Sequence, residues 1–232
     1  TFYYVMELLR GIDLETLVKR FGPVAPERAA YLLKQACHSL HEAHSRQLIH
    51  RDIKPANLFL CEYGEDRDFV KVLDFGLVKS ERTGDDADPR ITHEGSVPGT
   101  PAYLYPEAVT GKSPVDPRSD IYSMGCVAYW LLTGDLVFPA KTPLAMLTEH
   151  ASAEPVPPSR RSEFTIPEAL DEVVLACLAK RPEDRPDGAA DLSARLERIT
   201  WEQPWDNERA RAWWNLHGVD QARDAPMAAP RP

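Results

Sequence analysis

The stretch HRDIKPANLFL, His50 to Leu60, gathers charged and amide side chains in a few residues directly before a short apolar run. A second apolar run, FVKVL, follows an acidic connection and ends directly before Asp74. Two such runs with a charged connection predict an antiparallel β-hairpin between Asn57 and Phe75. Asn57 lies where the first strand begins and Asp74 where the second ends, so the pairing places both side chains at one open end.

The loop before the hairpin adds Asp52 and Lys54 to that open end. Neighbouring carboxylates that both stay ionised require a cation, and hard oxygen ligands with few protein donors suit Mg²⁺ bound to substrate phosphates. Taken singly, each of these residues is more often a turn former or a solvated charge. The joint pattern of HRDxKPxxN and DFG at 74–76 is far more specific and predicts a site for a metal nucleotide.

The composition is that of a globular chain with a substantial core, since 43% of its 232 residues are hydrophobic. The net charge is −9 without a basic stripe, so we expect neither nucleic acid nor anionic lipid as a partner. The four cysteines are scattered without a CxxC pair, which favours the reducing cytoplasm over a disulfide framework. No apolar run approaches the roughly 20 residues that cross a bilayer.

Hydrophobic periodicity predicts a mainly helical body. Helices are expected at 26–47, 119–134, 166–180 and 187–199. The opening residues FYYVMELL predict a buried strand, and the polar residues 79–98 predict a mobile loop.

Four tryptophans, Trp201, Trp205, Trp213 and Trp214, follow the last predicted helix. We expect residues 200–224 to be a Trp-rich extension that packs on the body, with a docking patch as the alternative. Residues 225–232, rich in Pro and Ala, are expected to be a linker.

The motifs HRDIKPANLFL, KVLDFGLVK, GTPAY and SDIYSMG make the chain similar to the eukaryotic-like serine/threonine protein kinases of bacteria. The resemblance runs from about Phe2 to Ile199 and implies a protein-kinase-like α+β fold. Residues 1–199 would be the hinge and a mainly α-helical C-lobe, with a short β-hairpin at the catalytic cleft. ATP and Mg²⁺ are the implied cofactors, and Ser or Thr hydroxyls of protein substrates the implied acceptors.

The resemblance assigns the catalytic residues by motif position. Asp52 would accept or orient the proton of the substrate hydroxyl, and Lys54 would steady the γ-phosphate. Asn57 and Asp74 would bind Mg²⁺. Thr100 in GTPAY would contact the catalytic Asp and Lys, which marks a Ser/Thr preference. Tyr105 departs from the family, which has a small residue before Pro-Glu, and this puts the shape of the peptide pocket in doubt.

The segment VMELL resembles the hinge of the family. Met6 would be the gatekeeper, and the backbones of Glu7 and Leu9 would bond adenine. Asp13 would contact the ribose and Phe59 would form part of the adenine floor. For Asp13, an equally good interpretation is a carboxylate that caps the helix beginning there.

Five residues are implied as structural supports. His50 and Phe75 would pack to fix the active arrangement. Asp120 would bond the backbone of the catalytic loop, and Glu107 would form a buried ion pair with Arg185.

Regulation is implied by Arg51, the position at which the family receives the phosphate of its activation loop. Thr92 matches a position that is phosphorylated in bacterial relatives. Glu94 replaces the second Thr of their pattern, either as a phosphate mimic or as one more solvated acid.

Three histidines, His38, His41 and His44, recur every third residue of the first predicted helix. Positions three apart are about 300° apart around a helix, so the outer two are splayed. We therefore interpret them as an exposed polar face, with a metal site as the weaker alternative.

The family also requires a Gly-rich loop, a strand Lys and a helix Glu, and we expect these parts of an N-terminal lobe to lie before Thr1. That lobe would be a partner of this chain and the place where a dimer forms. The chain alone would bind ATP weakly, turn over negligibly and expose an apolar surface around Phe2, Tyr4 and Phe59. We expect an active, cytoplasmic kinase domain, with any membrane anchor of the parent outside this chain.

Two other classes of function are open. A pseudokinase or scaffold module would keep the site without catalysis, and the four intact catalytic positions argue against it. A small-molecule phosphotransferase of kinase-like fold is disfavoured by GTPAYLYPE and Arg185.

Overall fold

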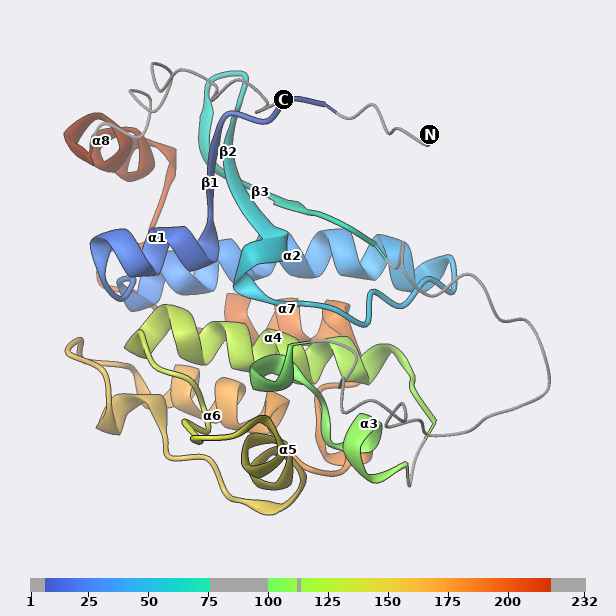
Figure 1. Ribbon diagram of the computed structural model, residues 1–232. Helices are drawn as coiled ribbons and strands as arrows, with labels where there is room; N and C mark the ends of the chain where they lie inside the picture. The colour runs from blue at the N-terminus through green and yellow to red at the C-terminus, as the bar shows by residue number, and fades with distance from the viewer. Residues whose placement is uncertain (1–6, 76–99, 112–113, 218–232) are drawn as a thin grey trace, which may run out of the picture.

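The computed structural model describes residues 7–75, 100–111 and 114–217. Its strands are β1 (Gly11–Asp13), β2 (Leu58–Tyr63) and β3 (Asp66–Val72). Its helices are α1 (Leu14–Phe21), α2 (Pro26–Ser45), α3 (Pro106–Thr110), α4 (Pro117–Thr133), α5 (Pro143–Ser152), α6 (Glu168–Cys177), α7 (Ala189–Glu197) and α8 (Asn207–His217). The sheet stands above the long helix α2, while α4 to α7 form the body below it (Figure 1).

The three strands form one antiparallel sheet in the order β1-β2-β3. Leu58 pairs with Val72 and Leu60 with Val70, so the predicted hairpin is confirmed. The connection is tighter than the charged segment suggested, because both strands continue into it and only residues 64 and 65 remain as the turn.

The first described strand begins after the apolar segment FYYVMELL, of which residues 2–6 lie outside the described residues. In the described part of FYYVMELL, residues 7–9 form no strand, and β1 begins at Gly11. Gly11 has φ 153°, and a Cβ there would lie 1.9 Å from the carbonyl oxygen of Leu60. The close approach of β1 to β2 thus requires glycine, a backbone constraint that hydrophobicity does not reveal.

Helix α2 forms where its periodicity predicted it. Pro26 occupies the first turn, where a backbone N–H is not needed. One face of the helix is 3% exposed or less, and it comprises Ala29, Leu32, Leu33, Ala36 and Leu40. This face packs toward α4 and α7, while β3 lies along the same helix and places the hairpin above the core.

Helix α4 is the centre of the helical body, and nearly all of its residues are buried. A Cβ added to Gly125 would lie 2.7 Å from the Cβ of Cys177, so glycine lets α4 approach α6 closely. No helix within the described ranges is both long and apolar enough to cross a membrane.

Helices α6 and α7 lie within the predicted ranges, whereas α1, α3 and α5 were not predicted. In α5 the inward residues are Leu147 and His150, and Leu144 is 70% exposed. Its apolar residues therefore do not gather on one face, and tertiary contacts determine the helix.

His150 is a buried imidazole, 1% exposed, at the junction of α5 with α4. Its Nδ1 lies 2.8 Å from the hydroxyl of Tyr122, and its ring meets Phe138 edge-on at 5.0 Å. Burial and, secondarily, the nearby Lys180 ammonium lower the pKa of His150 to about 4.

We predict that His150 destabilises the fold as the pH falls from about 6.5 to about 4, because the unfolded chain binds a proton that the folded chain excludes. Its contribution by pH 4 is roughly 3 kcal/mol. Urea unfolding between pH 7 and 4 should show a smaller loss of stability for His150→Gln than for the parent. Leu144→Gln, on the exposed side of the same helix, should keep the parental pH dependence; equal slopes for His150→Gln and the parent would contradict the prediction.

Candidate active site

The loop between α2 and β2 brings together the polar groups of HRDIKPAN. The ammonium of Lys54 donates to Asp52 Oδ2 at 2.7 Å, and the carboxamide nitrogen of Asn57 donates to the same oxygen at 3.1 Å. That nitrogen also donates to the backbone oxygen of Asp52 at 2.8 Å. A 3₁₀ turn, Pro55–Asn57, folds Asn57 back to reach it. One carboxylate, one ammonium and one carboxamide therefore form a single hydrogen-bonded group.

Asp74 joins this group through the backbone. The N–H of Leu73 donates to the carbonyl oxygen of Asn57 at 2.8 Å, which closes the open end of the hairpin directly before Asp74. Asp74 is exposed and has φ 58°, a left-handed conformation that is uncommon outside glycine. Gly76, which follows it, lies outside the described residues.

The donor set fits a magnesium nucleotide. The Asn57 nitrogen is occupied by Asp52, and among the described residues no group donates to the Asn57 oxygen, which leaves that oxygen as a ligand. A carboxamide oxygen and a carboxylate from two ends of a hairpin are hard donors of the kind that Mg²⁺ shares with phosphates. The described residues hold no group of three or more His, Cys, Asp or Glu side chains suited to a metal ion.

Asp120, at the start of α4, holds the backbone of the loop. Its Oδ1 accepts the N–H of Arg51, and its Oδ2 accepts the N–H of His50, both at 2.8 Å. Arg51 itself is exposed and has φ 67°, so the carboxylate pins a strained peptide directly before Asp52.

His44 also contacts Asp120, with its Nε2 2.8 Å from Oδ2. The interpretation of the three histidines as an exposed face is therefore wrong for His44, whose side chain is 8% exposed. The spacing of the histidines could not predict this contact, because Asp120 lies 76 residues further along the chain. His38 and His41 are exposed, as expected.

His50 links the loop to the end of β3. Its Nε2 lies 2.8 Å from the carbonyl oxygen of Leu73, its Nδ1 accepts the N–H of Asp52 at 3.3 Å, and its ring lies 4.7 Å from that of Phe75. The side chain of His50 therefore contacts the backbone of both segments that carry the candidate site residues. His50 is buried and Phe75 is half-buried.

Glu107 and Arg185 form a buried bidentate ion pair, with N–O distances of 2.8 and 2.7 Å. The hydroxyl of Ser119 donates to Glu107 as well. The remaining Arg185 donors reach the backbone oxygens of Ala179, Arg118 and Lys180. The pair therefore joins α3, the start of α4 and the segment after α6.

The residues expected to contact adenine and ribose are only partly described by the structure. Both carboxylate oxygens of Asp13 accept from Thr16, at 2.8 Å each, so Asp13 caps α1 in this structure. Glu7 pairs with Lys71 on β3, and Phe59 is half-buried in the sheet. Leu9 is partly exposed, while Met6 and the apolar residues Phe2 and Tyr4 lie outside the described residues.

The residues expected to choose or regulate the substrate are only partly described. Thr100 is half-buried before a 3₁₀ turn, and within the described ranges no hydrogen bond joins its side chain to Asp52 or Lys54. Thr92 and Glu94 lie outside the described residues. Tyr105 is 4% exposed and belongs to the core, and burial raises its pKa to about 12. The bulky residue that departs from the motif therefore fills the core.

Comparison with known proteins gives matches over most of the chain. A family model described as the protein kinase domain matches residues 1–195. The serine/threonine-protein kinase PknB of Mycolicibacterium smegmatis is 40% identical over 228 residues, which is 98% of this chain and 34% of that protein. The serine/threonine-protein kinase pkn3 of Myxococcus xanthus is 38% identical over 210 residues, 90% of this chain and 37% of that protein. The chain thus spans about a third of the length of these relatives.

Solved structures show the same fold. Rad53 residues 1–466 in complex with AMP-PNP matches with a TM-score of 0.66 and 26% identity, over 84% of this chain and 46% of that one. The kinase domain of PknI from Mycobacterium tuberculosis matches with a TM-score of 0.57 and 23% identity, over 83% of this chain and 63% of that one. The second likeness concerns the fold alone.

We predict that Glu107→Gln lowers the free energy of unfolding by about 3–5 kcal/mol, because it leaves the buried Arg185 guanidinium without its counter-charge. Denaturant unfolding measures the change. Glu183→Gln removes one member of the exposed pair with Arg181 and should leave the denaturation midpoint unchanged. Equal effects of the two substitutions would show that the buried pair contributes no more than the exposed one.

Proposed function

The chain belongs to the protein kinase family, and from that premise we propose that the protein transfers the γ-phosphoryl group of ATP to serine and threonine hydroxyls of other proteins. The observation that carries the proposal is the hydrogen-bonded group of Asp52, Lys54 and Asn57, closed onto Asp74 by the Leu73 to Asn57 bond. The motif positions of these four residues support the same proposal.

In the proposed step the substrate hydroxyl oxygen forms a bond to the γ-phosphorus while the bond from that phosphorus to ADP breaks. Asp52 receives the hydroxyl proton through the carboxylate that Lys54 and Asn57 orient. Lys54 would lie beside the transferred phosphoryl group, and the oxygens of Asn57 and Asp74 would hold Mg²⁺. When bound, Mg²⁺ would neutralise part of the charge of the phosphates.

The finer assignments belong to the same proposal. The backbones of Glu7 and Leu9 would bond adenine beside Met6 and Phe59, and Asp13 would reach the ribose in addition to capping α1. Thr100 would approach Asp52 when a peptide is bound, and Arg51 would bind a phosphate on Thr92. The exposure of Arg51 supports the last assignment, because its guanidinium is accessible to solvent.

The partners follow from the family. We propose protein substrates and, over the triphosphate, an N-terminal lobe that carries the Gly-rich loop and could pair two copies of the protein. The short span of the chain relative to its relatives supports a larger parent, so activity is best measured on the full-length protein. Cytoplasmic ATP would place the kinase domain in the cytoplasm.

We predict that Asp52→Asn in the full-length protein lowers kcat roughly 10²- to 10⁴-fold with little change in nucleotide affinity, because it removes only the proton acceptor. Phosphate transfer from labelled ATP to a Ser/Thr protein substrate measures the rate. Asp135→Asn, at an exposed position after α4, is the matched control and should retain full activity. Labelling that persists in Asp52→Asn would refute the assignment, and a parent that binds Mg²⁺ and ATP without any transfer would be a scaffold instead.

A second prediction separates the metal ligands from the base. Asp74→Asn should raise the Mg²⁺ concentration needed for half-maximal nucleotide binding, since it replaces a charged oxygen ligand by a neutral one. Titration of Mg²⁺ at fixed ATP, followed by fluorescence or calorimetry, gives that concentration. Asp52→Asn should leave it unchanged; an unchanged Mg²⁺ requirement in Asp74→Asn would remove Asp74 from the metal site.

A further inference from the structure

The segment from Trp205 to His217 follows helix α7, and its helix α8 lies beside the sheet, above the helical body (Figure 1). Its helix α8 contacts β3, and its side chains also reach the end of α1 and the start of α2. The Trp213 ring lies 5.0 Å from Phe21, and Arg209 pairs with Glu27 at 2.8 Å.

Asp68 on β3 is the centre of this contact and is 0% exposed. Its Oδ1 accepts from Trp214 Nε1 at 2.7 Å and from Arg28 Nη2 at 2.8 Å. Its Oδ2 accepts from Arg28 Nε at 2.7 Å and from Trp205 Nε1 at 2.9 Å. Four donors therefore satisfy one buried carboxylate, and two of them come from the C-terminal segment.

The backbone at Asp68 is shaped to make this possible. Cys61 pairs with Phe69 but Tyr63 pairs with Asp66, so β3 carries one extra residue at this point. Asp68 has φ 57°, and its own carbonyl oxygen accepts from the Gln35 side chain on α2 at 2.8 Å. The bulge is held from below by α2 and from outside by the tryptophans.

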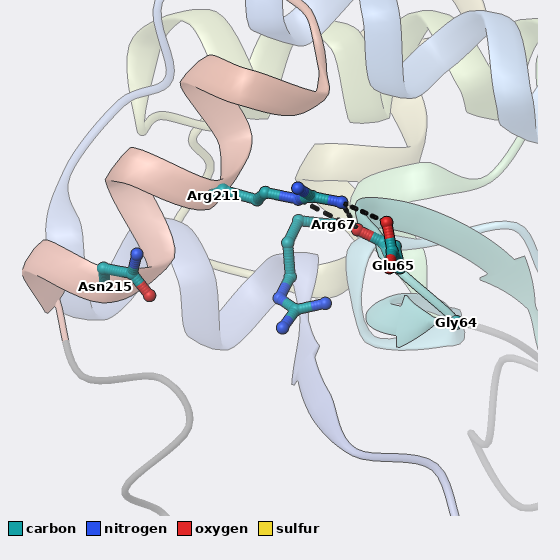
Figure 2. Close-up of a pocket in the computed structure, with 5 residues that line it drawn as sticks. All are labelled: Gly64, Glu65, Arg67, Arg211 and Asn215. Atoms are coloured by element: carbon teal, nitrogen blue, oxygen red, sulfur yellow. Dashed lines mark hydrogen bonds and ion pairs between the residues drawn. The ribbon is translucent and has the colours of Figure 1, made fainter.

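The turn of the hairpin is held as well. Figure 2 shows Arg211 extending from α8 to the turn, where its guanidinium donates to the backbone oxygen of Glu65 at 2.7 and 3.0 Å. Asn207 accepts the N–H of Arg67 at 2.8 Å. A cavity of about 320 Å³ lies between α8 and the turn, and it is separate from the Asp52 group at the other end of the hairpin.

The hairpin connects the two ends directly. From Asp68 the strand runs through Val70 and Val72, which pair with the buried Leu60 and Leu58, to the Leu73 N–H bonded to Asn57. The C-terminal segment therefore contacts the hairpin at its bulge and its turn. The proposed metal ligands Asn57 and Asp74 lie at the open end of the same hairpin.

We propose that Asp68, Trp205 and Trp214 are positioning residues for the Mg²⁺-nucleotide: the C-terminal segment fixes the hairpin and thereby the placement of Asn57 and Asp74. This inference rests on the proposed function. The segment from Trp205 to His217 would then support the nucleotide site through the hairpin, without contacting the substrate.

The test uses Trp214→Phe and Asp68→Asn in the full-length protein, with Trp201→Phe as the matched control. Trp214→Phe removes the N–H donor and keeps an aromatic ring. Trp201 packs against the core, and no described group accepts its N–H. Hydrogen exchange at the Leu73 amide, the KM for Mg²⁺-ATP and kcat are measured for each.

We expect both variants to speed exchange at Leu73 and to raise the KM for Mg²⁺-ATP roughly three- to tenfold, with a smaller change in kcat, because the ligands are displaced rather than removed. The control should change neither. A lower melting temperature with unchanged KM and unchanged Leu73 exchange would overturn the proposal, since the segment would then be merely structural. Faster exchange at the Leu73 amide with an unchanged KM for Mg²⁺-ATP would also overturn the proposal.

The positioning role can also be tested if the protein proves not to be an active kinase. If the parent protein transfers no phosphate, nucleotide affinity from calorimetry replaces KM. Faster Leu73 exchange together with weaker Mg²⁺-ATP binding in the two variants would still support the positioning role. Unchanged exchange or unchanged binding would overturn it whether or not the protein is a kinase.

Discussion

The buried carboxylate of Asp120 is the constraint on which the candidate site depends. It accepts the backbone N–H groups of His50 and Arg51 and lies against His44, so helices α2 and α4 and the loop between α2 and β2 meet at one side chain. A buried charge is tolerated only when it is fully hydrogen-bonded, and here its donors are the peptides of the loop itself. The helical core therefore maintains the left-handed backbone conformation of Arg51, and this conformation fixes the position of Asp52.

The site and the core are thus built in two layers. The helical body supplies rigid anchors in Asp120 and in the pair of Glu107 with Arg185, and the hairpin supplies the groups that face a nucleotide. One hydrogen bond, between His50 Nε2 and the backbone oxygen of Leu73, joins the helical body to the hairpin. Preorganisation of this kind is what phosphoryl transfer requires of a protein, since most of the catalysis is positioning and electrostatic stabilisation.

Sequence patterns predicted those parts of the structure that are determined by residues close together in the chain. The hairpin, α2 and the residues of the candidate site could be named because alternation, helical periodicity and motif spacing are all read over short windows. The bonding of His44 and of Asp68 could not, because their partners lie 76 and 146 residues away. The strand at Gly11–Asp13 was not predicted for a related reason: it depends on how closely Gly11 approaches Leu60 of another strand.

The separation of Asp68 from Trp214 also orders events during synthesis. The hairpin leaves the ribosome well over a hundred residues before its last hydrogen-bond donor has been made. Until then, among the described residues, Arg28 is the only side chain that can donate to the Asp68 carboxylate. Because domains are completed as units during translation, this hairpin gains its full set of hydrogen bonds only after Trp214 has been synthesised.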